Sequence, residues 1–186
     1  MKLLVKLSSW CYRVTTLPVV VAAVIIFAFF MVVVLPQMSG QLEAISGVGI
    51  SPDTSFIYTA RDLYAMAEAY GPEGRSYYIY SRFTFDLIWP AVYLFFLAAA
   101  ITYLFKSLPE KSSWRLLNLL PFAGALFDLF ENSAASLVMF RYPAETVVIA
   151  HLAPLFTFLK WLFIGLSFAA LAAGLVFIIA RKRLKA

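Results

Sequence analysis

Two carboxyl groups and an amide interrupt an otherwise apolar segment where the chain reads DLFENS, at residues 128–133. Asp128, Glu131 and Asn132 fall within one helical turn. An ionisable side chain in hydrocarbon costs about 2.5–3.5 kcal/mol on insertion scales, so such residues usually face the interior of a helix bundle and mark a functional site. Neighbouring carboxyl groups can supply a general acid beside a general base, which makes Asp128 and Glu131 the candidate catalytic residues.

A second polar stripe precedes this one in the sequence. If one helix runs unbroken from GPEGR, its residues at spacings of three and four share a face, and Arg82 and Asp86 can pair at i, i+4. The last apolar segment adds Lys160, whereas His151 falls on another face of that helix and is read as an interfacial residue. Counted at 1.5 Å per residue from the basic anchors, the charges of all three segments lie in the same half of a bilayer.

These stripes predict a polar pocket inside the membrane, opening outward. Its predicted ligand-binding residues are Arg75, Tyr78, Arg82, Asp86, Trp89, Tyr93, Asp128, Glu131, Asn132 and Lys160. The leading hypothesis is a site for a membrane lipid or another small amphiphile, with acid/base chemistry as an option, and both an enzyme and a binding protein fit these residues. Three alternatives stay open: proton- or cation-coupled transport, a non-catalytic membrane subunit or assembly factor, and polar residues that only hold helices together.

Cofactor and metal chemistry have weak support. Carboxylate and amide oxygens are suitable ligands for Mg²⁺ or Ca²⁺, but no spacing here is diagnostic, so neither a metal nor a cofactor is predicted. The single Cys11 excludes an internal disulfide, and the chain contains no GxSxG, P-loop, GxGxxG or HExxH motif. A nucleic-acid partner is not expected, because the basic residues flank the apolar segments. A homo-oligomer or a larger membrane complex is compatible with the sequence.

The composition is that of a polytopic membrane protein. Of 186 residues, 63% are hydrophobic and only 13% are charged, whereas a soluble domain is nearer half apolar and a quarter charged. We expect a single all-α transmembrane domain over 1–186, a four-helix bundle. Its predicted spans are about 15–35, 83–105, 116–139 and 154–180, with a long loop at 36–82.

Basic residues set the expected orientation. The N-terminal arm, the loop between spans 2 and 3 and the tail RKRLKA hold ten of the fifteen Lys and Arg. The positive-inside rule then puts both termini in the cytoplasm and the 36–82 loop outside. The expected location is the plasma (inner) membrane. Within that loop, Thr59 and Asp62 can form a capping box, Leu63 and Tyr70 share an apolar face, and Gly71 suits the stop. This pattern predicts a short amphipathic helix over 59–70.

The combination of GPEGR, FDLIWP and DLFEN resembles small uncharacterised prokaryotic four-span membrane proteins. The resemblance covers spans 2 and 3 and the loop before them. It implies a bacterial or archaeal plasma membrane and attaches no activity to the chain.

Overall fold

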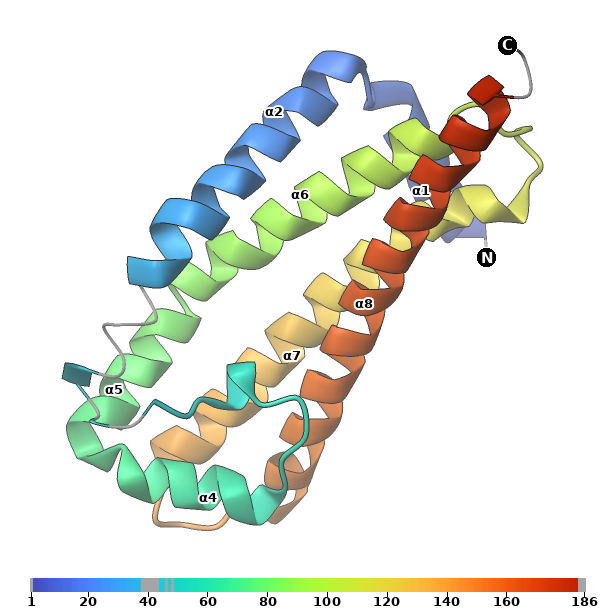
Figure 1. Ribbon diagram of the computed structural model, residues 1–186. Helices are drawn as coiled ribbons and strands as arrows, with labels where there is room; N and C mark the ends of the chain where they lie inside the picture. The colour runs from blue at the N-terminus through green and yellow to red at the C-terminus, as the bar shows by residue number, and fades with distance from the viewer. Residues whose placement is uncertain (1, 38–43, 46, 48, 184–186) are drawn as a thin grey trace.

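The computed structural model describes residues 2–37, 44–45, 47 and 49–183, and over this part of the chain it is all-α, as expected (Figure 1). The long helices α2, α6, α7 and α8 run along the length of the molecule, and α4 and α5 close one of its ends. The elements are α1 (Lys2–Val14), α2 (Leu17–Phe29) continued by a π-helical turn (Phe30–Val34), the 3₁₀ turn η2 (Pro52–Thr54), α4 (Ala60–Ala69), α5 (Gly71–Arg82), α6 (Phe85–Phe105), the 3₁₀ segment η3 (Ser113–Leu119), α7 (Leu120–Arg141) and α8 (Val147–Arg183).

Within the described residues, three helical stretches are long and apolar enough to cross a membrane: Leu17–Gln37, Gly71–Phe105 and Val147–Arg181. The predicted third span corresponds to α7 and does not reach the same apolarity. Asp128, Glu131 and Asn132 lower its hydropathy, although its 22 residues are long enough to span a bilayer. A multi-pass membrane protein is therefore supported by three of the four predicted spans.

The helix ends differ from the sequence expectations in two places. The stripe helix does not run unbroken from GPEGR, because α5 ends at Arg82 and α6 begins at Phe85. The last helix begins at Val147, well before the predicted start at 154, and passes through Pro154. A proline within the first turns of a long helix removes a single hydrogen bond, and the packing of the rest of α8 compensates for that loss.

Small residues allow the long helices to approach one another. The most extensive helix pair is α7 with α8 (Figure 1). A Cβ added at Gly124 would lie 3.2 Å from Ile164 Cγ1, so this glycine faces α8 at close range, and Ala135 is fully buried further along α7. Small residues at both positions of α7 thus admit a neighbouring helix.

The predicted loop helix is present as α4. Thr59 Oγ1 accepts a hydrogen bond from the Asp62 backbone N–H at 3.3 Å, and Asp62 Oδ2 accepts one from the Thr59 backbone N–H at 2.8 Å. These hydrogen bonds lower the pKa of the Asp62 carboxyl. Gly71 follows with a positive φ of 62°, as a helix stop requires. The buried Leu63 and Ala67 pack α4 across the end of α7 and α8, so α4 covers one end of the bundle (Figure 1).

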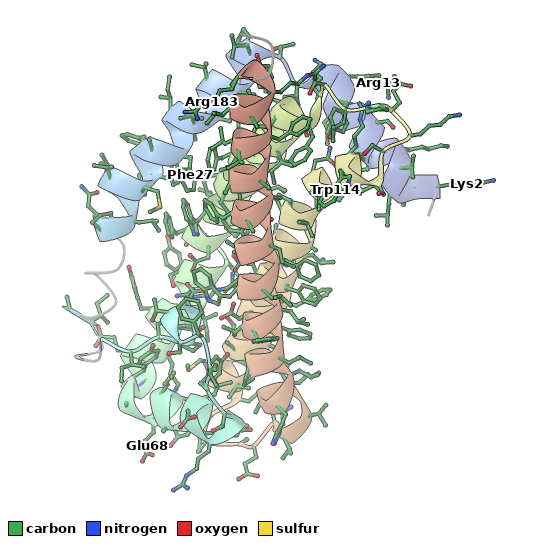
Figure 2. The ribbon with its side chains drawn as sticks, turned by 45° about the vertical axis from the view of Figure 1, so that its right-hand side comes forward. Lys2, Arg13, Phe27, Glu68, Trp114 and Arg183 are labelled. Carbon is green, nitrogen blue, oxygen red and sulfur yellow. The ribbon has the colours of Figure 1, made fainter. Side chains whose placement is uncertain are left out.

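The opposite end carries the basic segments. Both termini lie there in Figure 1, and Figure 2 places Lys2, Arg13, Trp114 and Arg183 at this end with Glu68 of α4 at the other. The helix α1, which the sequence analysis did not predict, packs on η3 there. Ser8 Oγ donates to Asn118 Oδ1 at 2.9 Å, and Tyr12 Oη donates to the Arg115 carbonyl at 3.2 Å.

Cys11 lies on the buried face of α1, and this placement gives a testable expectation. Its side chain is 5% exposed, and burial raises the pKa of its thiol. A thiol reacts as its thiolate, so we expect Cys11 to react slowly with a maleimide at pH 7 in the folded protein and rapidly after denaturation in SDS. Rapid labelling of the folded protein, measured by mass spectrometry, would contradict the docked position of α1.

Candidate functional site

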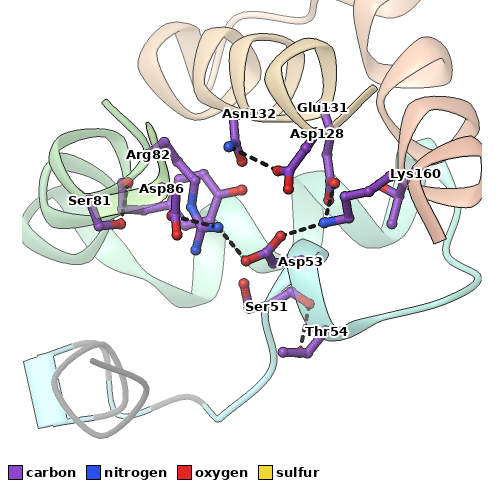
Figure 3. A network of polar contacts seen from close by, with 12 residues as sticks. Ser51, Asp53, Thr54, Ser81, Arg82, Asp86, Asp128, Glu131, Asn132 and Lys160 are labelled. Carbon is purple, nitrogen blue, oxygen red and sulfur yellow. Dashed lines mark hydrogen bonds and ion pairs between the residues drawn. The ribbon is translucent and has the colours of Figure 1, made fainter. Parts of the chain in front are cut away.

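Charged side chains from four elements meet near the α4 end of the bundle (Figure 3). The end of α5 and the start of α6 supply Arg82 and Asp86. The middle of α7 supplies Asp128 and Glu131, and α8 supplies Lys160. The break between α5 and α6 does not separate Arg82 from Asp86, since Arg82 Nη1 lies 2.9 Å from Asp86 Oδ2. The sequence analysis expected these five charges together, and the structure brings them together.

The sixth member of this charge cluster, Asp53, comes from the turn η2. Its carboxylate bridges two cations from different helices: Oδ2 lies 2.5 Å from Arg82 Nη1, and Oδ1 lies 2.6 Å from Lys160 Nζ. Figure 3 shows Asp53 between the two bases. The turn is held locally by Ser51, whose carbonyl accepts from Thr54 Oγ1 and from Ser55 Oγ. Asp53 therefore fixes the loop that carries η2 onto the helices.

The ion pairs of Asp53 change its acidity. Burial alone would raise the pKa of the Asp53 carboxyl, but the Arg82 guanidinium and the Lys160 ammonium hold that pKa well below its ordinary range. The carboxylate is thus ionised at any physiological pH.

Lys160 has a second carboxylate partner deeper in the bundle. Its Nζ lies 2.5 Å from Glu131 Oε2, and the two side chains are only 3% and 1% exposed. An ammonium between two carboxylates is an effective arrangement for keeping buried charges compensated. Glu131 is therefore a direct counter-ion of Lys160.

Asp128 is held differently from the other acids. Tyr93 Oη donates to its Oδ2 at 2.9 Å, and Asn132 Nδ2 donates to its Oδ1 at 3.2 Å. Both donors are neutral. Among the described residues, no Lys or Arg forms an ion pair with Asp128, although its side chain is buried.

The charge cluster carries an excess of acid. It contains four carboxyl groups and two cations, a formal charge of −2 when all are ionised. Oxygen atoms of Asp53, Asp128 and Glu131 lie within 4.8 Å of one another, a spacing that would suit a hard metal ion. Lys160 Nζ, however, already contacts two of these three carboxylates and supplies a positive charge there.

A cavity of about 620 Å³ opens beside the cluster, between α2, α6, α8 and the loop that carries η2. One end is polar and is lined by Asp53, Arg82, Asp86, Asp128 and Lys160. The remainder is largely aromatic and aliphatic. It is lined by Phe27, Met31 and Leu35 of α2, Phe85, Trp89 and Tyr93 of α6, and Trp161, Ile164 and Phe168 of α8. Its volume is in the range of small-molecule sites.

Some predicted site residues lie outside this cavity lining. Arg75 donates to the Ala67 carbonyl at 2.8 Å and lies over the Tyr142 ring, away from the charge cluster. Tyr78 is fully buried beneath Arg82, whose guanidinium carbon lies 4.5 Å from the ring centroid. Glu131 and Asn132 are buried behind Lys160 and Asp128 and do not line the cavity.

His151 is exposed, with Nδ1 2.8 Å from the Val147 carbonyl of its own helix. It belongs to neither the charge cluster nor the cavity, in agreement with its interpretation as an interfacial residue.

The sequence analysis missed Asp53 and the contribution of α2. Asp53 lies in a Pro-Asp turn, and such turns are common in loops that have no function. The apolar residues of α2 repeat all around the helix, so no pattern marks Phe27 or Met31 as cavity residues. Only the path of the outer loop brings these residues to the other helices.

The chain matches no protein-family model, no curated protein and no solved structure. The inferences that follow therefore rest on the residues and geometry of the chain alone.

Proposed function

We propose that the chain is a four-span plasma-membrane protein whose outer half holds a pocket for a lipid or another small amphiphile. The observation that carries this proposal is the character of the cavity, which is charged at one end and apolar along the rest. A molecule with a polar head and a hydrocarbon tail matches both parts. A soluble polar metabolite would leave the apolar walls without a partner, and a plain hydrocarbon would leave the charges unsolvated.

The helix α7 serves as the fourth span in this proposal. Its 22 residues extend about 33 Å at 1.5 Å per residue, against about 30 Å for the hydrocarbon core. Its polar residues Asp128, Glu131 and Asn132 are buried against the other helices, while Leu126, Phe130 and Phe140 are exposed. An apolar outer face with a polar inner face suits contact with lipid better than contact with water.

The distribution of charge supports the proposed orientation. The basic N-terminal helix α1, the segment between α6 and α7 and the end of α8 lie at one end of the molecule (Figure 2). The positive-inside rule makes this end cytoplasmic. The charge cluster lies toward the opposite end, beneath the outer loop that Asp53 anchors (Figure 3).

The cytoplasmic half of the bundle favours binding over transport. Below Tyr93, the core is built from Leu97, Ile101, Leu104 and Phe105 of α6 with Ala170 of α8. Leu97 and Ile101 are fully buried, and a Cβ added at Gly174 would lie 3.0 Å from Leu104 and Phe105 atoms. Such packing closes the inner half, so a transported cation would need these helices to separate. The closed half and the open cavity together fit a binding site reached from outside or laterally.

The same geometry bears on acid/base chemistry. A ligand in the cavity would meet Asp128 but not Glu131, because Glu131 lies behind Lys160 and does not line the cavity. A general acid and a general base must both reach the reacting atoms. We therefore assign Asp128 to ligand binding and Glu131 to compensation of Lys160.

Fluorescence quenching by a brominated fatty alcohol tests the proposal. Trp89 and Trp161 line the cavity, so a background with Trp10 and Trp114 replaced by Phe reports on the pocket alone. We expect saturable quenching by the brominated alcohol in maltoside micelles. Ile164→Phe, which enlarges a side chain of the cavity lining without adding an indole, should weaken the binding at least about tenfold, equivalent to about 1.4 kcal/mol.

The matched control is Leu162→Phe, which adds the same side chain at a residue that is 42% exposed and lies outside the cavity lining. Its quenching constant should equal that of the parent. Quenching that does not saturate, or that falls equally in both variants, would contradict the proposed pocket.

A further inference from the structure

We infer that the pocket selects an amphiphile whose head group carries a positive charge, an amine or a quaternary ammonium, with Asp128 as its counter-ion. This inference rests on the proposed function and adds the chemical class of the ligand. Three features support this inference. They are the ion pairs that the other acids already form, the groups that surround Asp128, and the position of Asp128 in the cavity lining.

Asp128 is the acid of the charge cluster that forms no ion pair with Arg82 or Lys160. Asp53, Asp86 and Glu131 each lie within 2.9 Å of a nitrogen of Arg82 or Lys160, whereas Asp128 receives hydrogen bonds only from the neutral Tyr93 and Asn132. Both Asp128 oxygens accept, as expected for an ionised carboxylate. Its side chain lines the cavity, so a ligand can supply the missing positive charge.

The two cations of the cluster are already engaged. Arg82 contacts two carboxylates and Lys160 contacts two, with Asp53 shared between them. Both ion pairs of Arg82 use Nη1, and its buried Nε has no hydrogen-bond partner among the described residues. An anionic head group at this donor would nevertheless add negative charge to a cluster whose formal charge is already −2. A cationic head group lowers this excess, and in a low-dielectric site the difference strongly favours the cation.

A buried polar atom beside Asp128 also lacks a partner of its own. Within the described residues, Asn132 Oδ1 makes no hydrogen bond, and Asn132 is more than nine-tenths buried. Ser51 lines the cavity beside Asp53. Its hydroxyl oxygen can accept a hydrogen bond from an ammonium N–H and is a second polar contact for the proposed head group.

Aromatic rings complete the surroundings of an ammonium. Trp89 and Tyr93 line the cavity next to Asp128, with their rings edge-on at 5.8 Å between centroids. Trp161 lines the cavity from α8 and already holds Lys160 Nζ 5.3 Å from its ring centroid. Indole and phenol faces attract ammonium groups, so these rings stabilise a desolvated cation. The tail then lies along Phe27, Ile164 and Phe168.

Three probes of one chain length test this inference: tetradecylamine, tetradecanol and tetradecanoate. Their affinities are measured by tryptophan fluorescence in maltoside micelles at pH 7, in the background lacking Trp10 and Trp114. The parent should bind the amine at least about tenfold more tightly than the alcohol, and the carboxylate most weakly. Because each variant is compared with the parent for the same probe, differences between the probes in their partition into micelles cancel.

Asp128→Asn keeps the size of the side chain and removes its charge. It should weaken amine binding at least about tenfold and change alcohol binding less than about twofold. Tyr93→Phe removes one hydrogen-bond donor to Asp128 but leaves the charge of Asp128, so this variant should still prefer the amine. It provides a second test if Asp128→Asn folds poorly. Glu68→Gln, an exposed acid on α4, should behave as the parent.

The outcomes separate the two proposals. Equal affinity for the amine and the alcohol, or unchanged amine binding in Asp128→Asn, would overturn the cationic ligand and leave the amphiphile pocket standing. Tightest binding of the carboxylate would overturn it in favour of recognition by Arg82 and Lys160. Failure of all three probes to bind would refute the amphiphile pocket as well.

Discussion

Asp53→Asn is expected to lower the free energy of unfolding by about 3 kcal/mol, because it leaves two buried cations without their shared counter-ion. Arg82 Nη1 and Lys160 Nζ lie 2.5 and 2.6 Å from the Asp53 carboxylate. Removing one partner of a buried ion pair costs about 3–5 kcal/mol, and the lower end applies because the Asp53 side chain is 30% exposed. Unfolding in SDS followed by circular dichroism measures the loss.

The pH dependence has a definite sign. Because the pKa of Asp53 is lowered in the folded protein, its contribution to stability is present above the pKa of the unfolded chain. It is lost as the pH falls through the depressed folded value. Mild acid should therefore leave the loop anchored.

Glu68→Gln is the control for Asp53→Asn, since it removes an exposed acid from the same outer region. An Asp53→Asn protein as stable as the parent would show that the loop does not anchor the helices.

Lys160→Met is expected to have a larger effect, about 4 kcal/mol, because the ammonium compensates two acids inside the bundle. Its side chain is 3% exposed, and Glu131 beside it is 1% exposed. Without Lys160, Glu131 must take up a proton or remain charged in an apolar environment. Adding Glu131→Gln to Lys160→Met should therefore recover part of the loss, about 1–2 kcal/mol.

The double-mutant cycle distinguishes this account from simple loss of packing. Glu131→Gln alone should cost less than Lys160→Met, because it reduces the excess of acid in the charge cluster. Additive effects of the two substitutions, measured by the same SDS titration, would contradict a direct pairing of Lys160 with Glu131.

Much of the site was accessible from the sequence because membrane helices make polar residues conspicuous. Asp86, Asp128, Glu131 and Lys160 each interrupt an apolar segment, and counting residues from the basic ends was enough to predict that they lie in the same half of the bundle. The helix α4 was also predictable, since Thr59 and Asp62 form a capping box and Gly71 suits the stop. These patterns depend on local spacing, which the sequence shows directly.

The missing parts depend on tertiary structure. Asp53 lies in an ordinary turn, and its function arises only when the outer loop passes over α5 and α8. Phe83 and Thr84, at the break between α5 and α6, are not residues that typically end a helix, and Pro90 lies inside α6. The apolar wall of the cavity needs α2 beside α6 and α8, and uniform hydrophobicity does not specify such a neighbour.

The most direct test of the pocket is native mass spectrometry of the protein released from maltoside micelles after purification from its own membrane. The account predicts a bound mass of an amphiphile in the parent and in Leu162→Phe, and its absence in Ile164→Phe at equal stability. The same bound mass in Ile164→Phe, or a parent without any bound amphiphile even after addition of tetradecylamine, tetradecanol and tetradecanoate in turn, would contradict the existence of the pocket.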